Sequence, residues 1–243
     1  MKIEVWSDFV CPFCYIGKRR LEVALAKFPH KDKVIVQYKS YELDPSSPKD
    51  VNVNFHQVLA SKYGMSLDEA KKTTDGIAQQ AASVGLTYHF DKMIPTNTFD
   101  AHRLAKFAQT CGKENEVTEK LLFAYFTESK HLGDHKTLAD IAETVGLDRQ
   151  EVLNVLADEQ AFSDEVRSDE QQAQQVGVRG VPFFVINEKY AISGAQPEEV
   201  FLNALQKVWE EESGAPILQD LSNNGAEGAS CTDGSCVVPN KEA

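Results

Sequence analysis

The sequence has no apolar run that approaches the roughly 20 residues needed to span a bilayer. Its first residues lack the basic and apolar segments of a secretory signal, so we expect a cytoplasmic protein that does not enter a membrane. An excess of positive charge is missing as well, because 25 Lys and Arg stand against 37 Asp and Glu, a formal net charge of −12. A chain this acidic is a poor partner for nucleic acid and for anionic membranes.

Cysteine is scarce, with five residues among 243. Without an export signal, these cysteines indicate catalytic or redox thiols rather than a framework of structural disulfides. No internal repeat is visible, and 42% hydrophobic with 26% charged residues is ordinary for a globular protein. The length predicts one domain with a sizeable insertion.

Two of the cysteines form the motif Cys11-Pro12-Phe13-Cys14, between an apolar segment at 3–6 and a helix expected over 12–28. A cysteine at a helix start faces unpaired N–H groups and the positive end of the helix dipole, which favour the thiolate. Proline suits the first turn, where no N–H is needed. The second cysteine lies one turn further on and is placed to close a disulfide with the first. A strand, a CxxC motif and a helix in this order indicate a thioredoxin-like redox site.

Two other interpretations of this motif stay open. It could be half of a zinc site, since Cys231 and Cys236 form a second pair, although zinc pairs usually lie on knuckle turns and not on a long amphipathic helix. It could also be a chance pairing of structural cysteines. The spacing and the strand–helix context favour the redox interpretation.

The rest of the pattern predicts the architecture. Strands are expected at 2–8 and 33–41 around the first helix, and a hairpin at 182–187 and 190–193 precedes a last helix that begins at Pro197. Pro182 marks a strand start, because proline inside a sheet is confined to first positions, edges or bulges. Residues from about 54 to 176 have helical spacing almost throughout. A separate helical binding domain is the alternative, but the block's position between two halves of a sheet favours an insertion.

We therefore expect an α/β protein with a thioredoxin-like fold and an inserted all-helical domain. Residues 1–45 and 177–213 would form the discontinuous thioredoxin-like domain, 46–176 the helical insertion, and 214–243 a flexible tail with a CxxxxC motif.

Three segments carry a resemblance to a known family: residues 7–20 around Cys11, residues 97–104, and residues 180–185 running on to 193–196. In this order they resemble the DsbA-like branch of the thioredoxin superfamily, specifically its FrnE-like members, over about residues 1–212. The resemblance implies a cis Val181–Pro182 bond packed against the disulfide. It also implies an exposed Cys11 that forms mixed disulfides, a deeper Cys14 that resolves them, and a Val181 backbone that pairs with an extended substrate. Pro12 and Phe13 would tune the redox potential and contact substrate.

The segment at 97–104 has two interpretations. From the residues alone, Asn97 or Thr98 is an N-cap and His102 is a half-exposed helix residue. The resemblance implies instead that the segment lies over the active-site face, with Asn97, Thr98 and, less directly, His102 as candidates for binding glutathione or substrate. Cys111, a lone cysteine near the end of the same helix, is expected to be a small buried residue.

The predicted function is that of a protein thiol–disulfide oxidoreductase or isomerase. We expect no metal and no bound cofactor, glutathione as a candidate co-substrate, and thiol- or disulfide-containing proteins as partners; the oligomeric state is not indicated. In a reducing cytosol, reduction or isomerisation is the expected direction. One alternative is a glutathione-dependent enzyme of the kappa-class transferase or 2-hydroxychromene-2-carboxylate isomerase type, which carries serine where Cys11 stands. A non-enzymatic alternative is a chaperone-like or zinc-binding protein that uses the four paired cysteines.

The tail has its own motif. Residues 222–230 are small and polar like a linker, and Asp233-Gly234 favours a tight turn between Cys231 and Cys236. These cysteines are either incidental or a secondary redox pair that forms a disulfide and exchanges with Cys11 and Cys14. The 18 residues from Ser213 to Cys231 would reach about 24 Å as a flexible chain, which makes such an exchange feasible.

Overall fold

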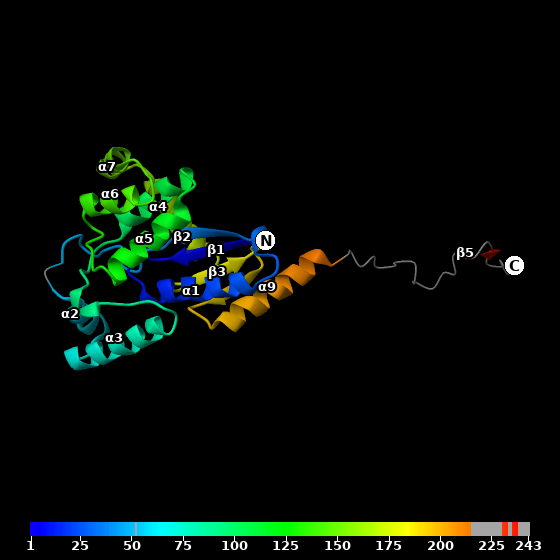
Figure 1. The fold of residues 1–243 in the computed structure, drawn as a ribbon, viewed down its shortest axis with the longest axis horizontal. Coiled ribbons are helices and arrows are strands. Elements are labelled where there is room, and N and C mark those ends of the chain that lie inside the picture. Colours follow the sequence, from blue (N-terminus) through cyan, green and yellow to red (C-terminus); the bar gives the residue numbers. More distant parts are fainter. Residues whose placement is uncertain (52, 215–229, 233–234, 238–243) are drawn as a thin grey trace. The chain divides into compact units, whose positions relative to one another are not determined.

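The computed structural model describes residues 1–51, 53–214, 230–232 and 235–237, and the chain divides into two units, Met1–Val208 and Trp209–Ala243. The order of elements along the chain confirms the predicted β-α-β, helical block and β-β-α (Figure 1). The elements are β1 (Lys2–Ser7), α1 (Pro12–Lys27), η1 (Lys31–Lys33), β2 (Ile35–Ser40), α2 (Phe55–Tyr63), α3 (Leu67–Ala82), η2 (Phe90–Lys92), α4 (Phe99–Thr110), α5 (Glu114–Phe126), α6 (His135–Glu143), α7 (Arg149–Ala157), α8 (Ser163–Gln175), β3 (Phe183–Ile186), β4 (Tyr190–Ser193), α9 (Glu198–Ser213), β5 (Ser230–Thr232) and β6 (Ser235–Val237).

The main sheet has the strand order β2-β1-β3-β4. Strand β1 is central: it pairs in parallel with β2, which α1 connects to it, and antiparallel with β3, where Ile3 faces Ile186. Strands β3 and β4 form the predicted hairpin. Its turn holds Asn187 and Glu188 at φ 50° and 55°, the positive angles that a tight hairpin turn requires. The sheet thus joins segments from the two ends of this unit.

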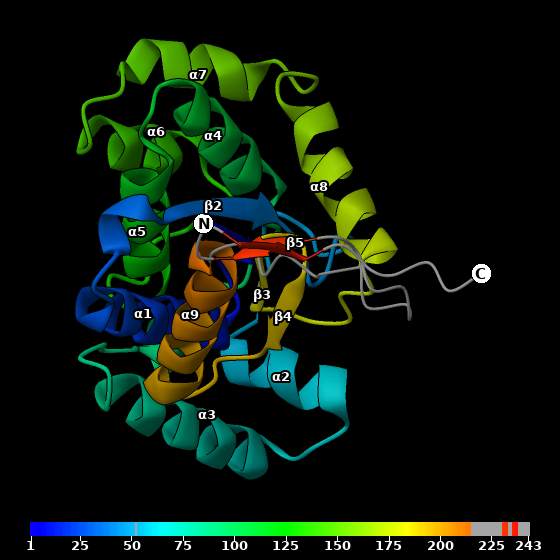
Figure 2. The ribbon, with the colours of Figure 1, turned by 90° about the vertical axis from the view of Figure 1, so that its right-hand side faces the viewer.

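Helices cover both faces of the sheet, as Figure 2 shows: α1 and α9 lie on one side and α8 on the other. On the first side Phe184 of β3 meets Phe201 of α9 edge to face, with ring centroids 4.8 Å apart. On the second side the Trp6 indole N–H donates to the Asp169 carbonyl of α8 at 2.9 Å. Two covered faces explain why four of the six residues of β1 are buried.

The inserted helices share a core with α1. In Figure 1, α4 to α7 gather on one side of the sheet, and α2 and α3 lie apart from them. The buried side chains Tyr15 and Ile16 of α1 belong to the same apolar cluster as Leu104 of α4 and Leu121 of α5. The thioredoxin-like fold with a helical insertion is therefore confirmed, whereas the domain boundaries at 46 and 176 stay a prediction.

The second unit contains a short antiparallel ladder in which Cys231 lies opposite Cys236. The remainder of the predicted tail, including the predicted Asp233-Gly234 turn, lies outside the described residues, and so do the side chains of both cysteines.

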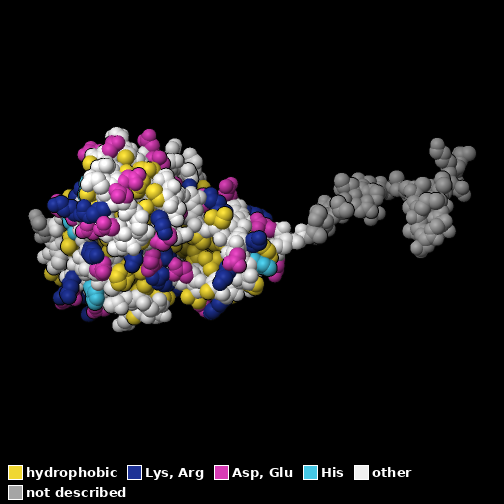
Figure 3. Space-filling view, turned by 45° about the horizontal axis from the view of Figure 1, so that its top comes forward, with side chains coloured by type: hydrophobic (Ala, Val, Ile, Leu, Met, Phe, Trp, Pro, Cys, Tyr) yellow, Lys and Arg dark blue, Asp and Glu magenta, His cyan; other side chains and the backbone are white. Residues whose placement is uncertain are grey.

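Within the described ranges, no helix has the length and apolar character that crossing a membrane requires. The face in Figure 3 shows basic and acidic side chains interspersed rather than a basic patch.

Candidate active site

The CxxC motif lies where β1 passes into α1. The Cys11 N–H donates to the Asp8 carbonyl at 3.2 Å, which closes the turn after β1, and the Cys14 N–H donates to the Cys11 carbonyl at 3.0 Å. Cys11 is the N-cap residue with an extended backbone (φ −87°, ψ 112°), and Pro12 takes the first helical position. The predicted placement of both cysteines at the helix start is confirmed.

The Cys11 thiol faces the loop before β3. Its Sγ donates to the Val181 carbonyl oxygen at 3.4 Å, and the Val181–Pro182 bond is cis. The cis bond and the position of this loop against Cys11 were predicted and are confirmed, whereas the hydrogen bond itself was not predicted. The expectation of an exposed Cys11 is wrong, however, because the residue is only 3% exposed. The Val181 loop lies against the Cys11 sulfur, and Phe13, which is 36% exposed, is the most exposed residue of the motif.

Cys14 lies deeper and is held as a thiol. Burial raises the pKa of Cys14 well above its ordinary value of 9.0, and a hydrogen bond with Cys11 acts in the same direction. The Ser7 hydroxyl and the Asp8 N–H, 3.5 Å from Cys14 Sγ, oppose this effect because they donate to the thiolate. Both Cys11 and Cys14 are free thiols in this structure. The two cysteines therefore differ chemically: one lies at the helix start facing the cis-proline loop, and the other is a buried, protonated partner.

A glycine allows α1 to approach the cis-proline loop closely. A Cβ at Gly17 would lie 3.0 Å from Pro182 Cγ and 3.2 Å from Phe184 Cζ, tighter than most real contacts. A larger residue would push the proline away from α1 and change the distance between the loop and Cys11. No local pattern around Gly17 indicates this role, because the residues that it approaches are far away in the chain.

The inserted domain supplies a tyrosine that no motif in the sequence indicates. The Tyr88 hydroxyl donates to the Pro12 carbonyl at 2.8 Å, and its ring stacks on Phe126 of α5 at a centroid distance of 4.5 Å. Burial raises the pKa of the Tyr88 phenol, so the group remains a neutral donor. The first turn of α1 is thus fastened to the helical insertion.

His102 lies behind the site rather than on its surface. Its Nε2 is 3.3 Å from Asp8 Oδ1, and Asp8 Oδ2 accepts the Leu43 N–H at 2.7 Å. The half-exposed position expected from the residues is wrong, because His102 is 2% exposed and its ring packs in a tilted arrangement against Phe9, with ring centroids 4.8 Å apart. Its pairing with a buried carboxylate from the turn after β1 accounts for the burial. A contact of His102 with substrate stays a prediction.

Asn97 and Thr98 are held in local structure. The Asn97 Nδ2 donates to Glu42 Oε1 at 3.2 Å and to the Pro45 carbonyl at 3.3 Å, and its Oδ1 accepts the Phe99 N–H at 2.8 Å. Asn97 thereby caps α4 although Thr98 is the boundary residue, and Thr98 itself is buried. Their contact with glutathione or substrate stays a prediction.

A shallow hollow of about 430 Å³ borders the cis-proline loop. It is lined by Gly177, Arg179, Gly180, Val181, Pro182, Phe183, Ser193 and Gly194. Its size suits a small ligand or part of a peptide. The hollow shares Val181 with the thiol site, so a molecule in it would lie beside the residue that contacts Cys11.

The expectation of a buried Cys111 is wrong. Cys111, expected to be buried, is exposed because it is the C-cap of α4 just before Gly112. In the described part of the chain, no group of three His, Cys, Asp or Glu side chains is placed to hold a metal ion.

Comparison with known proteins agrees with this geometry. Residues 2–206 match the family described as DSBA-like thioredoxin domain. The uncharacterized protein YwbO of Bacillus subtilis is 31% identical over 208 residues, 84% of this chain and 94% of that protein.

Two solved structures are similar as well. The probable DsbA oxidoreductase SCO1869 from Streptomyces coelicolor is 40% identical with a TM-score of 0.84, over 99% of this chain and 100% of that chain. A 2-hydroxychromene-2-carboxylate isomerase has a TM-score of 0.68 at 15% identity, over 87% of this chain and 98% of that chain, and so shares the fold. The match over residues 2–206 covers most of the chain, and the chain therefore belongs to the DsbA-like thioredoxin-domain family.

Proposed function

We propose that the protein is a thiol–disulfide oxidoreductase or isomerase that works through Cys11 and Cys14. The contact between Cys11 Sγ and the Val181 carbonyl, with Cys14 one helical turn deeper, is the observation that carries this proposal. Membership of the DsbA-like family supports a disulfide oxidoreductase or isomerase activity in general. The particular reaction and the roles of these residues are the proposal.

The reaction runs in two exchanges. The Cys11 thiolate attacks one sulfur of a substrate disulfide and forms a mixed disulfide while the first substrate thiolate leaves. Cys14 then loses its proton and attacks Cys11 Sγ, which forms the Cys11–Cys14 disulfide and releases the second substrate thiolate. The substrate disulfide is reduced and the protein dithiol is oxidised; the reverse sequence oxidises a substrate dithiol.

The Val181 loop would hold the substrate during these steps. The Val181 carbonyl accepts the Cys11 thiol in the free protein, and it becomes available to an extended peptide when that sulfur enters a mixed disulfide. The neighbouring hollow would take the residues that flank the substrate cysteine. Thiol- or disulfide-containing proteins are the substrates we propose, with glutathione as the small co-substrate that resets the dithiol. In the cytoplasm, the compartment we propose, reduction or isomerisation would be the prevailing direction.

The second candidate is a glutathione-dependent isomerase or transferase, which the shared fold favours. Enzymes of that type carry serine where this chain has Cys11, because activation of glutathione needs a hydroxyl donor and no protein disulfide. The presence of both Cys11 and Cys14 therefore argues against this candidate. Such an enzyme would keep its turnover when Cys14 is replaced, whereas an oxidoreductase would not.

The test compares the full-length protein with Cys11→Ser, Cys14→Ser and Cys111→Ser in insulin reduction and in refolding of scrambled ribonuclease. Cys11→Ser should fall to the uncatalysed rate while its circular dichroism remains that of the wild type. Cys14→Ser should accumulate mixed disulfides, visible on non-reducing gels and by mass. Cys111→Ser, which removes an exposed thiol, is the matched control and should retain full activity. Wild-type activity in Cys11→Ser would refute the proposal.

A further inference from the structure

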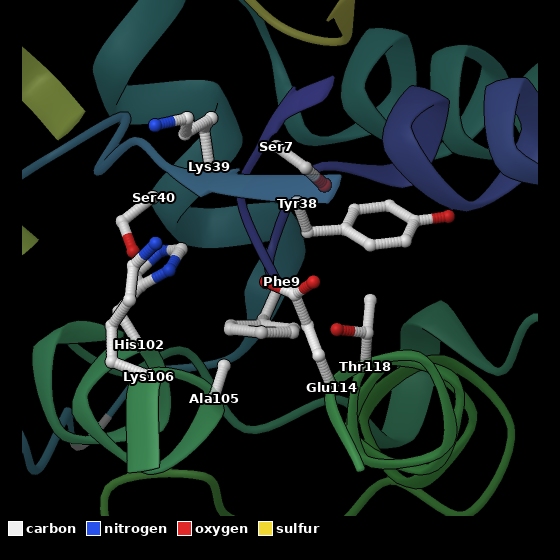
Figure 4. A pocket seen from close by; sticks show the side chains of 10 residues that line it. All are labelled: Ser7, Phe9, Tyr38, Lys39, Ser40, His102, Ala105, Lys106, Glu114 and Thr118. Carbon is white, nitrogen blue, oxygen red and sulfur yellow. The ribbon is translucent and has the colours of Figure 1, made fainter. Parts of the chain in front are cut away.

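Two hollows in the described part of the chain differ in size and in the charges around them. The enclosed one, between the sheet and helices α4 and α5, has a volume of about 10 Å³, and Lys39, Lys106 and Glu114 all line it (Figure 4). Its two lysines are already paired, because each forms an ion pair with Asp169 of α8. The open hollow of about 430 Å³ beside the cis-proline loop has room for part of a ligand, and the single charged residue that lines it is Arg179.

Arg179 differs from the other arginines of the chain. Its side chain is exposed, and within the ranges that the structure describes its guanidinium has neither a hydrogen bond nor an ion pair. The other five arginines each donate to a carboxylate or to a backbone carbonyl: Arg19, Arg20, Arg103, Arg149 and Arg167. The charge of Arg179 is therefore available to a molecule that enters the hollow.

The segments that form the hollow supply no acidic neighbour. Residues 171–187 contain no charged side chain apart from Arg179, and residues 190–197 contain none, in a chain with 26% charged residues. Three of the lining residues, Gly177, Gly180 and Gly194, are glycines that contribute no side chain to fill the space. The hollow is thus an open, positively charged site on an acidic protein.

This cation lies close to the proposed reactive sulfur. The Val181 carbonyl accepts the Cys11 thiol at 3.4 Å, and Val181 also lines the hollow. Arg179 precedes Val181 by two positions, so their Cα atoms are at most about 7 Å apart. An extended peptide advances about 3.3 Å per residue. When the cysteine of such a peptide reacts with Cys11, side chains two or three positions from it come within reach of the guanidinium.

We propose that Arg179 selects substrates that carry an acidic side chain about two or three positions from the reacting cysteine. The inference rests on the proposed function and names a substrate class for that site. A carboxylate in the hollow would pair with the guanidinium, whose planar fork suits it, and would meet no like charge from the lining. A lysine in the same place would be repelled. The formal net charge of −12 disfavours acidic peptides in general, so this preference depends on one local cation.

The experiment measures the first exchange with peptides of defined charge. The parent is the full-length protein with Cys14, Cys111, Cys231 and Cys236 replaced by serine, so that Cys11 is its only thiol. Each peptide has blocked ends, one cysteine in a mixed disulfide with thionitrobenzoate, and Glu, Gln or Lys two positions away on both sides. The Cys11 thiolate attacks the peptide sulfur, forms a disulfide with the peptide and releases the coloured thionitrobenzoate anion. Reaction of the same peptides with mercaptoethanol corrects for their intrinsic reactivity.

At low ionic strength the parent should react about two- to fivefold faster with the Glu peptide than with the Gln peptide, the effect of an exposed ion pair, and more slowly with the Lys peptide. About 0.5 M salt should remove most of this difference. Arg179→Gln should make the three rates nearly equal, Arg179→Lys should keep the parent's order, and Arg179→Glu should reverse it. Lys136→Glu changes the net charge by the same amount at an exposed position outside the hollow and should keep the parent's order. Near-ultraviolet circular dichroism checks that each variant is folded.

Equal rates for the three peptides in the parent would overturn the proposal. The parent's order in Arg179→Gln, together with a lower midpoint of urea unfolding, would also overturn it and would assign Arg179 to the C-terminal end of α8, where backbone carbonyls carry partial negative charge. Absence of thionitrobenzoate release from every peptide by the folded parent would instead contradict the proposed function, so the two failures are distinguishable.

Discussion

Replacement of Glu114 by glutamine should change how the stability of the protein depends on pH. The pKa of this carboxyl group rises from 4.5 to about 7 on folding because the group becomes buried. Between these values the folded protein keeps a proton that the unfolded chain has released. The free energy of unfolding of the wild type therefore contains a contribution that is fully present below pH 4.5 and is lost as the pH rises through 7.

The size of this contribution depends on the two pKa values. One pKa unit corresponds to about 1.4 kcal/mol, so the upper limit is about 3.4 kcal/mol. Glu114 is half-buried, and solvent screening reduces the value to about 1–2 kcal/mol. Glutamine does not titrate, so the stability of Glu114→Gln relative to the wild type should increase by this amount between pH 4.5 and pH 8.

The measurement is urea unfolding of both proteins at pH 4.5, 6, 7 and 8, monitored by the fluorescence of the buried Trp6. The difference between the two proteins is the quantity of interest, because groups with lowered pKa values, such as Asp100 and Glu119, titrate in both and cancel. Glu116→Gln should show no such trend. A difference that stays constant from pH 4.5 to 8, or that changes in favour of the wild type, would refute the assignment of a raised pKa to Glu114.

Two further predictions concern the insertion and the tail. Arg103→Met should destabilise the protein by about 3–5 kcal/mol in urea unfolding, because the buried guanidinium donates to the Val155 carbonyl at 2.7 Å and to the Ala161 carbonyl at 2.8 Å, and both acceptors lose this donor. Arg149→Met removes an exposed ion pair and should cost less than about 1 kcal/mol; a similar cost for both variants would contradict the argument. Deletion of residues 214–243 should slow insulin reduction, and Cys14→Ser should trap a Cys11 adduct with the tail, because Cys231 and Cys236 face each other across a ladder whose spacing suits a disulfide. An unchanged rate without an adduct would show the tail to be inert.

The parts of the fold and site that the sequence predicts are those with a local pattern. The CxxC motif at the start of a periodic apolar helix and the proline at the start of the third strand both depend on neighbouring residues. Their positions in α1 and before β3 agree closely with the prediction. The capping box of α3 is equally local, because Ser66 needs only Glu69 three residues away.

The features that the sequence did not predict depend on packing between distant segments. Asp8 meets His102, and Tyr88 meets Pro12, across 94 and 76 positions of the chain, and no periodicity encodes either contact. The burial of Cys11 has the same cause, because Val181 is 170 positions away. The exposed Cys111 differs: its place just before Gly112 marked a helix end, and helix ends are often exposed.

The distance in sequence between Cys11 and Val181 also has a consequence for the newly made chain. At roughly 5–20 residues per second, synthesis delivers Val181 on the order of 10–30 s after Cys11. During that interval both cysteines of the motif are uncovered and exchange freely with whatever small thiols and disulfides surround the ribosome. The oxidation state in which each molecule first closes its sheet therefore depends on the surrounding thiols and on the unfolded dithiol, and not on the redox potential of the folded site.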